Sequence, residues 1–156
     1  MTSTPNLKKE KNEQDFEQEN KPERIYLDSN IFIYSVNENT KEQEKAKEII
    51  KKIKGGYYLA FTSTLTIDEF LWAIQKASTK EIASNAAEIF FTLPNLVLVN
   101  IDSTTIKNAL EQYKNTFLNP RDAIHLAAMK QKNLTTIYST DPDFDNIKGI
   151  KRIDLS

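Results

Sequence analysis

The chain has 156 residues, of which 39% are hydrophobic, and its 21 basic residues nearly balance 22 acidic ones. This length fits one domain with a tail, and the near-neutral charge excludes a broad basic field for binding nucleic acid. The lack of cysteine excludes disulfides, thiolate metal sites and cysteine nucleophiles, and the single histidine excludes a histidine-rich zinc site.

Residues 1–23 form a polar segment in which lysine and glutamate alternate around one aromatic residue, Phe16. Such a segment buries too little apolar surface to fold alone, so we expect a disordered tail before a domain over 24–156. No apolar stretch approaches the roughly 20 residues of a membrane span, and no signal-peptide core is visible. These features predict a cytoplasmic protein with no membrane partner.

The first part of the domain alternates short apolar runs with amphipathic stretches. Arg24–Leu27 predicts a strand, and the helix expected over Asn30–Val36 would be capped by Ser29 or Asn30. Thr40–Lys54 predicts an amphipathic helix, because its alanine and isoleucine residues share one face. A pair of glycines ends this helix.

A second strand and two more helices are expected next. Tyr57–Phe61 predicts the strand, and Thr62 or Ser63 would cap a helix that reaches about Ala77. Thr79–Thr92 predicts one continuous helix, because a proline lies just beyond its end.

The last part of the domain repeats the alternation of strands and helices. Leu96–Ile101 is almost entirely apolar, which predicts a strand buried on both faces. The remaining expected elements are a helix from Asp102 or Ser103 to about Phe117, a helix capped by Asn119 that runs from Pro120 to about Lys132, and strands over Thr135–Tyr138 and Ile150–Ile153. The alternation predicts an α/β fold, a three-layer α/β/α sandwich around a mostly parallel sheet.

Four acidic residues from separate segments are expected at one edge of this sheet. Asp28 and Asp141 each follow a strand, and the carboxyl ends of parallel strands meet at the same edge. Asp122 lies in the first turn of its helix, where free N–H groups favour an anion. Glu69 borders the core face of its helix, although periodicity hardly separates it from Asp68.

Each of these acids also has an ordinary structural interpretation. Asp28 could simply cap the next helix, and Asp122 could stabilise the first turn of its own. Taken together, however, clustered carboxylates repel one another and have raised, coupled pKa values unless a cation is present. Oxygen ligands favour Mg²⁺ or Mn²⁺, which can activate water for attack on a phosphodiester.

The four acids lie in the segments Leu-Asp-Ser-Asn-Ile (27–31), Thr-Leu-Thr-Ile-Asp-Glu-Phe-Leu (64–71), Arg-Asp-Ala-Ile-His-Leu-Ala (121–127) and Ser-Thr-Asp-Pro-Asp-Phe-Asp (139–145). In this order the segments resemble the motifs of the PIN domain, the metal-dependent ribonuclease fold of VapC-type toxins. The resemblance covers roughly Arg24 to Ile153, nearly the whole domain.

This resemblance implies roles for individual residues. The metal ligands and catalytic residues would be Asp28, Glu69, Asp122 and Asp141, with Asp145 as a supplementary ligand. The side chains that orient them by hydrogen bonds would be Ser29, Asn30 and Thr140. Asp143 is left out of the ligand set, because it is expected to cap the short turn after the last site strand.

The resemblance also implies RNA cleavage by a metal-activated water, a homodimer and a small antitoxin that blocks the site. An alternative is a non-catalytic PIN-like module that binds RNA or a protein partner. Arg121, next to Asp122, and Lys76, in the helical sector of Glu69, are candidate substrate contacts. Trp72 shares that sector, and its exposure would indicate a dimer interface or a substrate edge.

Overall fold

Five parallel strands form the central sheet of the computed structural model, which describes residues 21–37 and 41–155. Their order is β3–β2–β1–β4–β5, so the first strand lies in the middle of the sheet, with β2 and β3 on one side of it and β4 and β5 on the other. The strands are β1 Glu23–Leu27, β2 Tyr58–Ser63, β3 Leu96–Val99, β4 Thr136–Tyr138 and β5 Lys151–Ile153. The predicted parallel sheet is confirmed.

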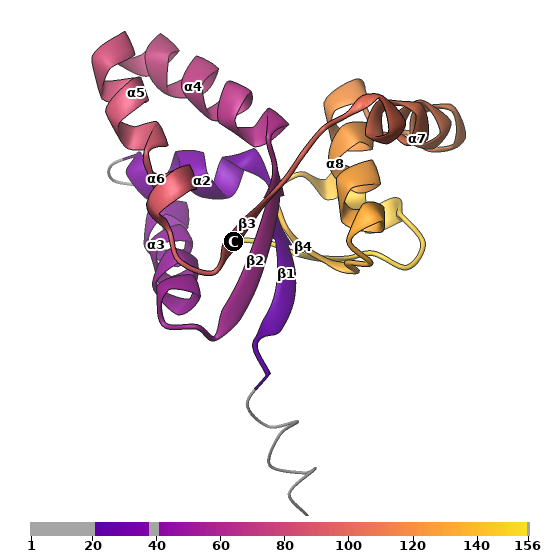
Figure 1. Cartoon of the computed structure of the whole chain (residues 1–156), viewed down its shortest axis with the longest axis horizontal. Coiled ribbons are helices and arrows are strands. Elements are labelled where there is room, and N and C mark those ends of the chain that lie inside the picture. Colours follow the sequence, from indigo (N-terminus) through magenta and orange to yellow (C-terminus); the bar gives the residue numbers. More distant parts are fainter. Residues whose placement is uncertain (1–20, 38–40, 156) are drawn as a thin grey trace, which may run out of the picture.

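Helices cover both faces of this sheet (Figure 1). One face carries α2 Ser29–Val36, α3 Lys41–Lys54, α4 Leu65–Ala77, α5 Lys80–Ala87 and α6 Ile89–Thr92. The other face carries α7 Ser103–Asn115 and α8 Pro120–Gln131, and a 3₁₀ helix, η1 Pro142–Asn146, precedes β5. The three-layer α/β/α sandwich is therefore confirmed.

The alternation of side chains along β1 divides the core into two halves. Ile25 and Leu27 are fully buried against the helices of the first face, whereas Tyr26 is buried on the side of α8. Because neighbouring side chains of a strand point to opposite faces, one apolar strand supplies both halves. Packing on both faces fixes the position of β1, and with it the position of Asp28, the residue that follows it.

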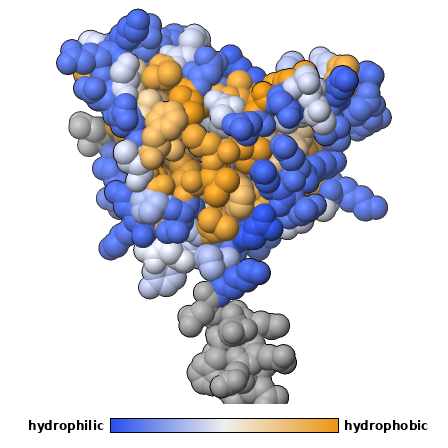
Figure 2. Space-filling view, viewed as in Figure 1, coloured by the Kyte–Doolittle hydropathy of each residue, from blue (hydrophilic) through white to orange (hydrophobic). Residues whose placement is uncertain are grey.

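The strand that we expected to be buried on both faces lies at the edge of the sheet. β3 pairs only with β2, and Leu96, Val97 and Leu98 are half-buried while Val99 is buried. The expectation was wrong because an apolar run does not specify where its strand lies in the order of the sheet. Figure 2 shows a broad apolar area on the face where β2 and β3 run.

Several predicted helix starts are also corrected. The N-cap of α2 is Asp28, whose carboxylate accepts from the Ser29 backbone, rather than Ser29 or Asn30. β2 continues through Thr62 and Ser63, so neither of them caps α4. The buried Thr62 hydroxyl instead donates to the carbonyl of Leu27 at 2.8 Å, which ties β2 to β1.

The single helix expected over Thr79–Thr92 is in fact two, α5 and α6, separated at Glu88. The segment predicted as a tail, residues 1–23, lies outside the described residues except for Lys21–Glu23, and Glu23 already belongs to β1. Among the helices that the structure describes, none is both long enough and apolar enough to cross a membrane.

Candidate active site

The four predicted acids meet where the carboxyl ends of the strands open between the two layers of helices. Asp28 directly follows β1, and Asp141 is the third residue after the end of β4. Glu69 belongs to α4, which follows β2, and Asp122 lies in the first turn of α8. In Figure 2 the molecule projects on either side of this edge, with a shallow depression between the projections.

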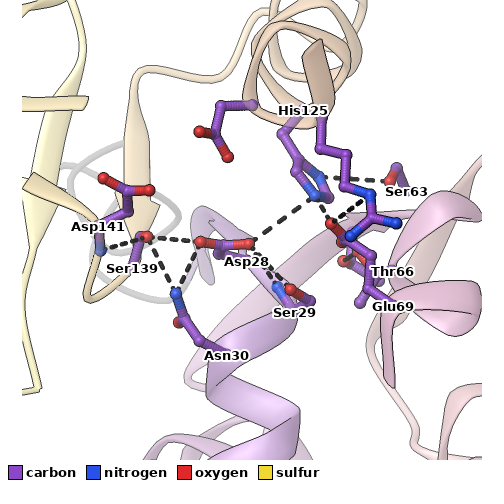
Figure 3. A network of polar contacts seen from close by, with 12 residues as sticks. Asp28, Ser29, Asn30, Ser63, Thr66, Glu69, His125, Ser139 and Asp141 are labelled. Carbon is purple, nitrogen blue, oxygen red and sulfur yellow. Dashed lines mark hydrogen bonds and ion pairs between the residues drawn. The ribbon is translucent and has the colours of Figure 1, made fainter. Parts of the chain in front are cut away.

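Asp28 stands at the centre of a network of hydrogen bonds (Figure 3). Its buried carboxylate accepts from the backbone of Ser29 at 2.6 Å and from the side-chain amide of Asn30 at 2.8 Å. The Ser139 hydroxyl donates to the same carboxylate at 2.5 Å. These donors hold the carboxylate in one orientation.

The hydroxyl groups that donate to Asp28 belong to Ser29, as expected, and to Ser139 rather than Thr140. Leu27 pairs with Tyr138 in the sheet, so the residues after them, Asp28 and Ser139, lie side by side. Ser139 also accepts from the backbone N–H of Asp141 at 3.0 Å. The register between β1 and β4, which the sequence alone does not provide, decides this contact.

The single histidine, His125, is a site residue that the sequence analysis missed. It is completely buried in α8, and its Nε2 atom lies 2.9 Å from a carboxylate oxygen of Glu69. The same nitrogen is 3.8 Å from Asp28, while Nδ1 is 2.8 Å from the Tyr26 hydroxyl. Its position one helical turn after Asp122 was the available signal, because residues three apart share a helix face.

His125 and Glu69 form a buried ion pair. Burial lowers the pKa of His125, but nearby Tyr26, Glu69 and Asp28 outweigh it and hold the pKa well above 6.5. Burial raises the pKa of Glu69, but the hydrogen bond and charge of His125 reverse this and lower it overall. The protonated imidazole thus holds the Glu69 carboxylate at the site. Asp68, the other acid of this segment, is exposed.

Asp122 ionises less readily than an ordinary aspartate. Burial and then the charges of Asp141 and Asp28 raise its pKa from 3.8 to about 7. The side-chain amide of Asn119 donates to its carboxylate and holds it at the start of α8. A raised pKa is what convergence of carboxylates predicts, because each charged neighbour disfavours another.

Asp143 and Asp145 make different contacts from those expected of them. Asp143 lies with Asp122 and Asp141, and it is Asp141 that caps η1 by accepting from the backbone of Asp143 at 2.9 Å. Both carboxylate oxygens of Asp145 instead accept from Arg152, each at 2.8 Å. Among the described residues, Asp145 belongs to neither group of candidate metal ligands.

Within the part of the chain that the structure describes, two groups of side chains have atoms close enough to share a cation: Asp28, Glu69 and His125, and Asp122, Asp141 and Asp143. Within each group the candidate ligand atoms all lie within 4.8 Å of one another. Beside the first group, the amide oxygen of Asn30 is buried and accepts no hydrogen bond. Carboxylate oxygens suit Mg²⁺ or Mn²⁺, so the acids present fit such an ion, whereas a protonated His125 would hold Glu69 in place rather than bind the ion.

The two candidate substrate contacts lie in different places. Arg121 is exposed, and its Nε atom is 3.9 Å from the Glu69 carboxylate, so its guanidinium borders the acids. Lys76 lies two turns further along α4, with its ammonium 4.9 Å from the centre of the Trp72 ring. Trp72 is 62% exposed, as a residue at a dimer interface or a substrate edge would be in the free protein.

Adding Mn²⁺ is expected to stabilise the protein at neutral pH. A ligand at about 100 times its dissociation constant adds about 2.7 kcal/mol to the free energy of unfolding, which raises Tm by several degrees. The shift should be smaller at about pH 5, because Asp122, with a pKa of about 7, is then protonated and binds metal less well. Differential scanning fluorimetry with Mn²⁺, Mg²⁺ or EDTA measures this, and an unchanged Tm would argue against the site.

Comparisons with known proteins assign the chain to a family. Residues 25–150 match the PIN domain family. The VapC ribonuclease Mb1869c of Mycobacterium bovis is 27% identical over 132 residues, which cover 83% of this chain and 98% of that protein.

Solved structures agree in fold. The structure of Mycobacterium tuberculosis VapC20, a Sarcin-Ricin loop cleaving toxin, has a TM-score of 0.65 at 18% identity and covers 78% of this chain and 92% of its own. A toxin–antitoxin complex from Klebsiella pneumoniae has a TM-score of 0.60 at 19% identity, covering 81% and 95%. With its parallel sheet and with acids at the carboxyl edge of that sheet, this chain belongs to the PIN domain family.

Proposed function

We propose that this protein is a divalent-metal-dependent endoribonuclease that uses Mg²⁺ or Mn²⁺. The observation that carries the proposal is the convergence of Asp28, Glu69, Asp122 and Asp141, from four separate segments, at the carboxyl edge of the sheet. The similar proteins named VapC ribonuclease support RNA as the substrate.

The chain's own residues would prepare the site for this reaction. Asp28, Glu69 and Asp122 would hold the cation with Asp141, and His125 and Ser139 keep two of these carboxylates in place. When bound, the ion would neutralise the carboxylates and act as a Lewis acid toward water and the phosphodiester. Arg121 lies at the border of the acids and can bind a backbone phosphate in bidentate fashion.

We further propose that the protein is the toxin of a toxin–antitoxin pair and forms a homodimer. The similar structure from Klebsiella pneumoniae is a toxin–antitoxin complex, which supports an antitoxin as partner. Exposed apolar side chains such as Phe91 and Phe117 offer surface for contacts with protein partners. A ribonuclease of this kind acts where its RNA and its antitoxin are made, so we place it in the cytoplasm.

Cleavage of labelled RNA by the purified protein tests the proposed function. We expect cleavage with Mn²⁺, none with EDTA, and none with the Asp28→Asn variant, which also controls for contaminating nucleases. Loss of a ligand should lower the rate by at least about 100-fold, since even residues that only support ligands cost 10- to 100-fold. Undiminished cleavage by Asp28→Asn would refute the site, and no binding of divalent ions by calorimetry would favour the non-catalytic module.

A further inference from the structure

An exposed aromatic ring lies beside the acids on α4. Glu69, Trp72 and Lys76 are spaced by three and four residues, so they follow one another along one face of the helix. This face differs from the one that carries the buried side chains of Phe70 and Ile74. Trp72 therefore belongs to the surface that continues outward from the candidate active site, along the part of α4 that projects beyond the sheet (Figure 1).

The surroundings of Trp72 distinguish it from the other exposed aromatic residues. Lys76 lies over its ring at 4.9 Å, and 62% of Trp72 remains exposed. Among the exposed aromatic side chains that the structure describes, such as Phe91 and Phe117, no other has a cation over its ring. A large apolar ring held in water beside a cation has the composition of a stacking surface for a nucleobase.

A positive charge lies near each end of the stretch of α4 from Glu69 to Lys76, and the one near Glu69 comes from α8. Arg121 borders Glu69, one turn before Trp72, and Lys76 follows one turn after it. The span from Glu69 to Lys76 is about 10 Å along the helix axis, at 1.5 Å per residue. An acidic site repels RNA, so a chain that enters it needs local cations for its phosphates and contacts to its bases.

We propose that Trp72 and Lys76 form a binding subsite for single-stranded RNA, in which a base next to the scissile phosphate stacks on the indole and the neighbouring phosphate contacts the ammonium. This inference rests on the proposed ribonuclease function and adds a location for the substrate. Any base can stack on an indole, so the subsite would add affinity for RNA and orient the strand without selecting a sequence. The charge pattern favours RNA over a protein partner at this position.

Trp72 is the only tryptophan of the chain, so intrinsic fluorescence reports directly on the subsite. In the Asp28→Asn background, which prevents cleavage, a short mixed-sequence RNA should quench this fluorescence on titration. An RNA of equal length without bases should quench it much less, because the backbone alone cannot stack. Anisotropy of a dye on the RNA measures total binding independently.

Substitutions complete the test. Trp72→Ala should weaken RNA binding by about 5- to 150-fold, while Trp72→Tyr should stay within a few-fold of the parent. Lys76→Ala should reduce the slope of the logarithm of the RNA-binding constant against the logarithm of the salt concentration by somewhat less than one, because one phosphate contact is lost. Tyr57→Ala, which removes an exposed aromatic ring just before the start of β2 and away from the acids, is the matched control and should leave RNA binding unchanged. In cleavage assays with otherwise wild-type protein, Trp72→Ala should raise KM and leave kcat nearly unchanged.

The outcomes separate the subsite from the function. RNA binding by anisotropy without any change in tryptophan fluorescence, or unaffected by Trp72→Ala, would overturn the subsite and leave the ribonuclease intact. Normal RNA binding by Trp72→Ala together with loss of self-association would assign the ring to a protein interface and also overturn the proposal. No RNA binding by the Asp28→Asn protein, together with no cleavage by wild type, would refute the proposed function itself.

Discussion

Replacing Asp122 with asparagine is expected to abolish RNA cleavage and, at the same time, to stabilise the metal-free protein at alkaline pH. Burial of the carboxylate, and then the charges of Asp141 and Asp28, raise its pKa to about 7. An asparagine has a similar shape and can still accept from Asn119, but it carries no charge. Activity would fall by at least about 100-fold, because a metal ligand is lost.

The sign of the effect of Asp122 on stability follows from linkage. A carboxyl group whose folded-state pKa lies above its unfolded value makes the fold lose stability as pH rises from 3.8 to about 7. The full shift corresponds to on the order of 4 kcal/mol. The advantage of Asp122→Asn over wild type should therefore be small at about pH 4 and reach a few kcal/mol at about pH 8.

Urea denaturation in EDTA at several pH values measures this difference. Asp68→Asn is the matched control, because this exposed acid lies next to Glu69 in sequence and outside the cluster. We expect Asp68→Asn to follow wild type at every pH. If Asp122→Asn were no more stable than wild type at alkaline pH, the raised pKa of Asp122 and the crowding of carboxylates around it would both be wrong.

Replacing His125 with alanine is expected to destabilise the protein strongly. The imidazole is fully buried, bonds to Glu69 at 2.9 Å and contacts the Tyr26 hydroxyl at 2.8 Å. Removing one partner of a buried ion pair leaves the other charge uncompensated and costs about 3–5 kcal/mol. Tm should fall by roughly 10 °C or more, and cleavage should fall because Glu69 loses its fixed position.

A double-mutant cycle with Glu69→Gln isolates the pair. The combined variant should lose less stability than the sum of the losses in the two single variants, because removing both charges leaves no unpaired charge in the site. Since the pKa of His125 is held above 6.5, its stabilising effect is complete below that pH and declines as pH rises toward the folded value. Tyr26→Phe, which removes only the hydroxyl, should cost far less. Additive losses would show that His125 and Glu69 do not act as a pair.

The sequence by itself determined most of the helices and strands and the edge of the sheet at which the acids lie. Apolar runs and helix periodicity predicted a parallel α/β sandwich, and the polar residues after strands placed Asp28 and Asp141 at one edge. The proline after Asn119 placed Asp122 in a first helical turn. These inferences succeeded because each depends on residues that are close in sequence, where periodicity and caps act.

Tertiary structure decided how those parts meet. Only the pairing of β1 with β4 brings Ser139 to Asp28, across a separation of 111 residues. His125 reaches Glu69 across 56 residues. The edge position of β3 was likewise set by strand order. Contacts between distant segments depend on register and packing, and local patterns do not encode either in a form that a single sequence reveals.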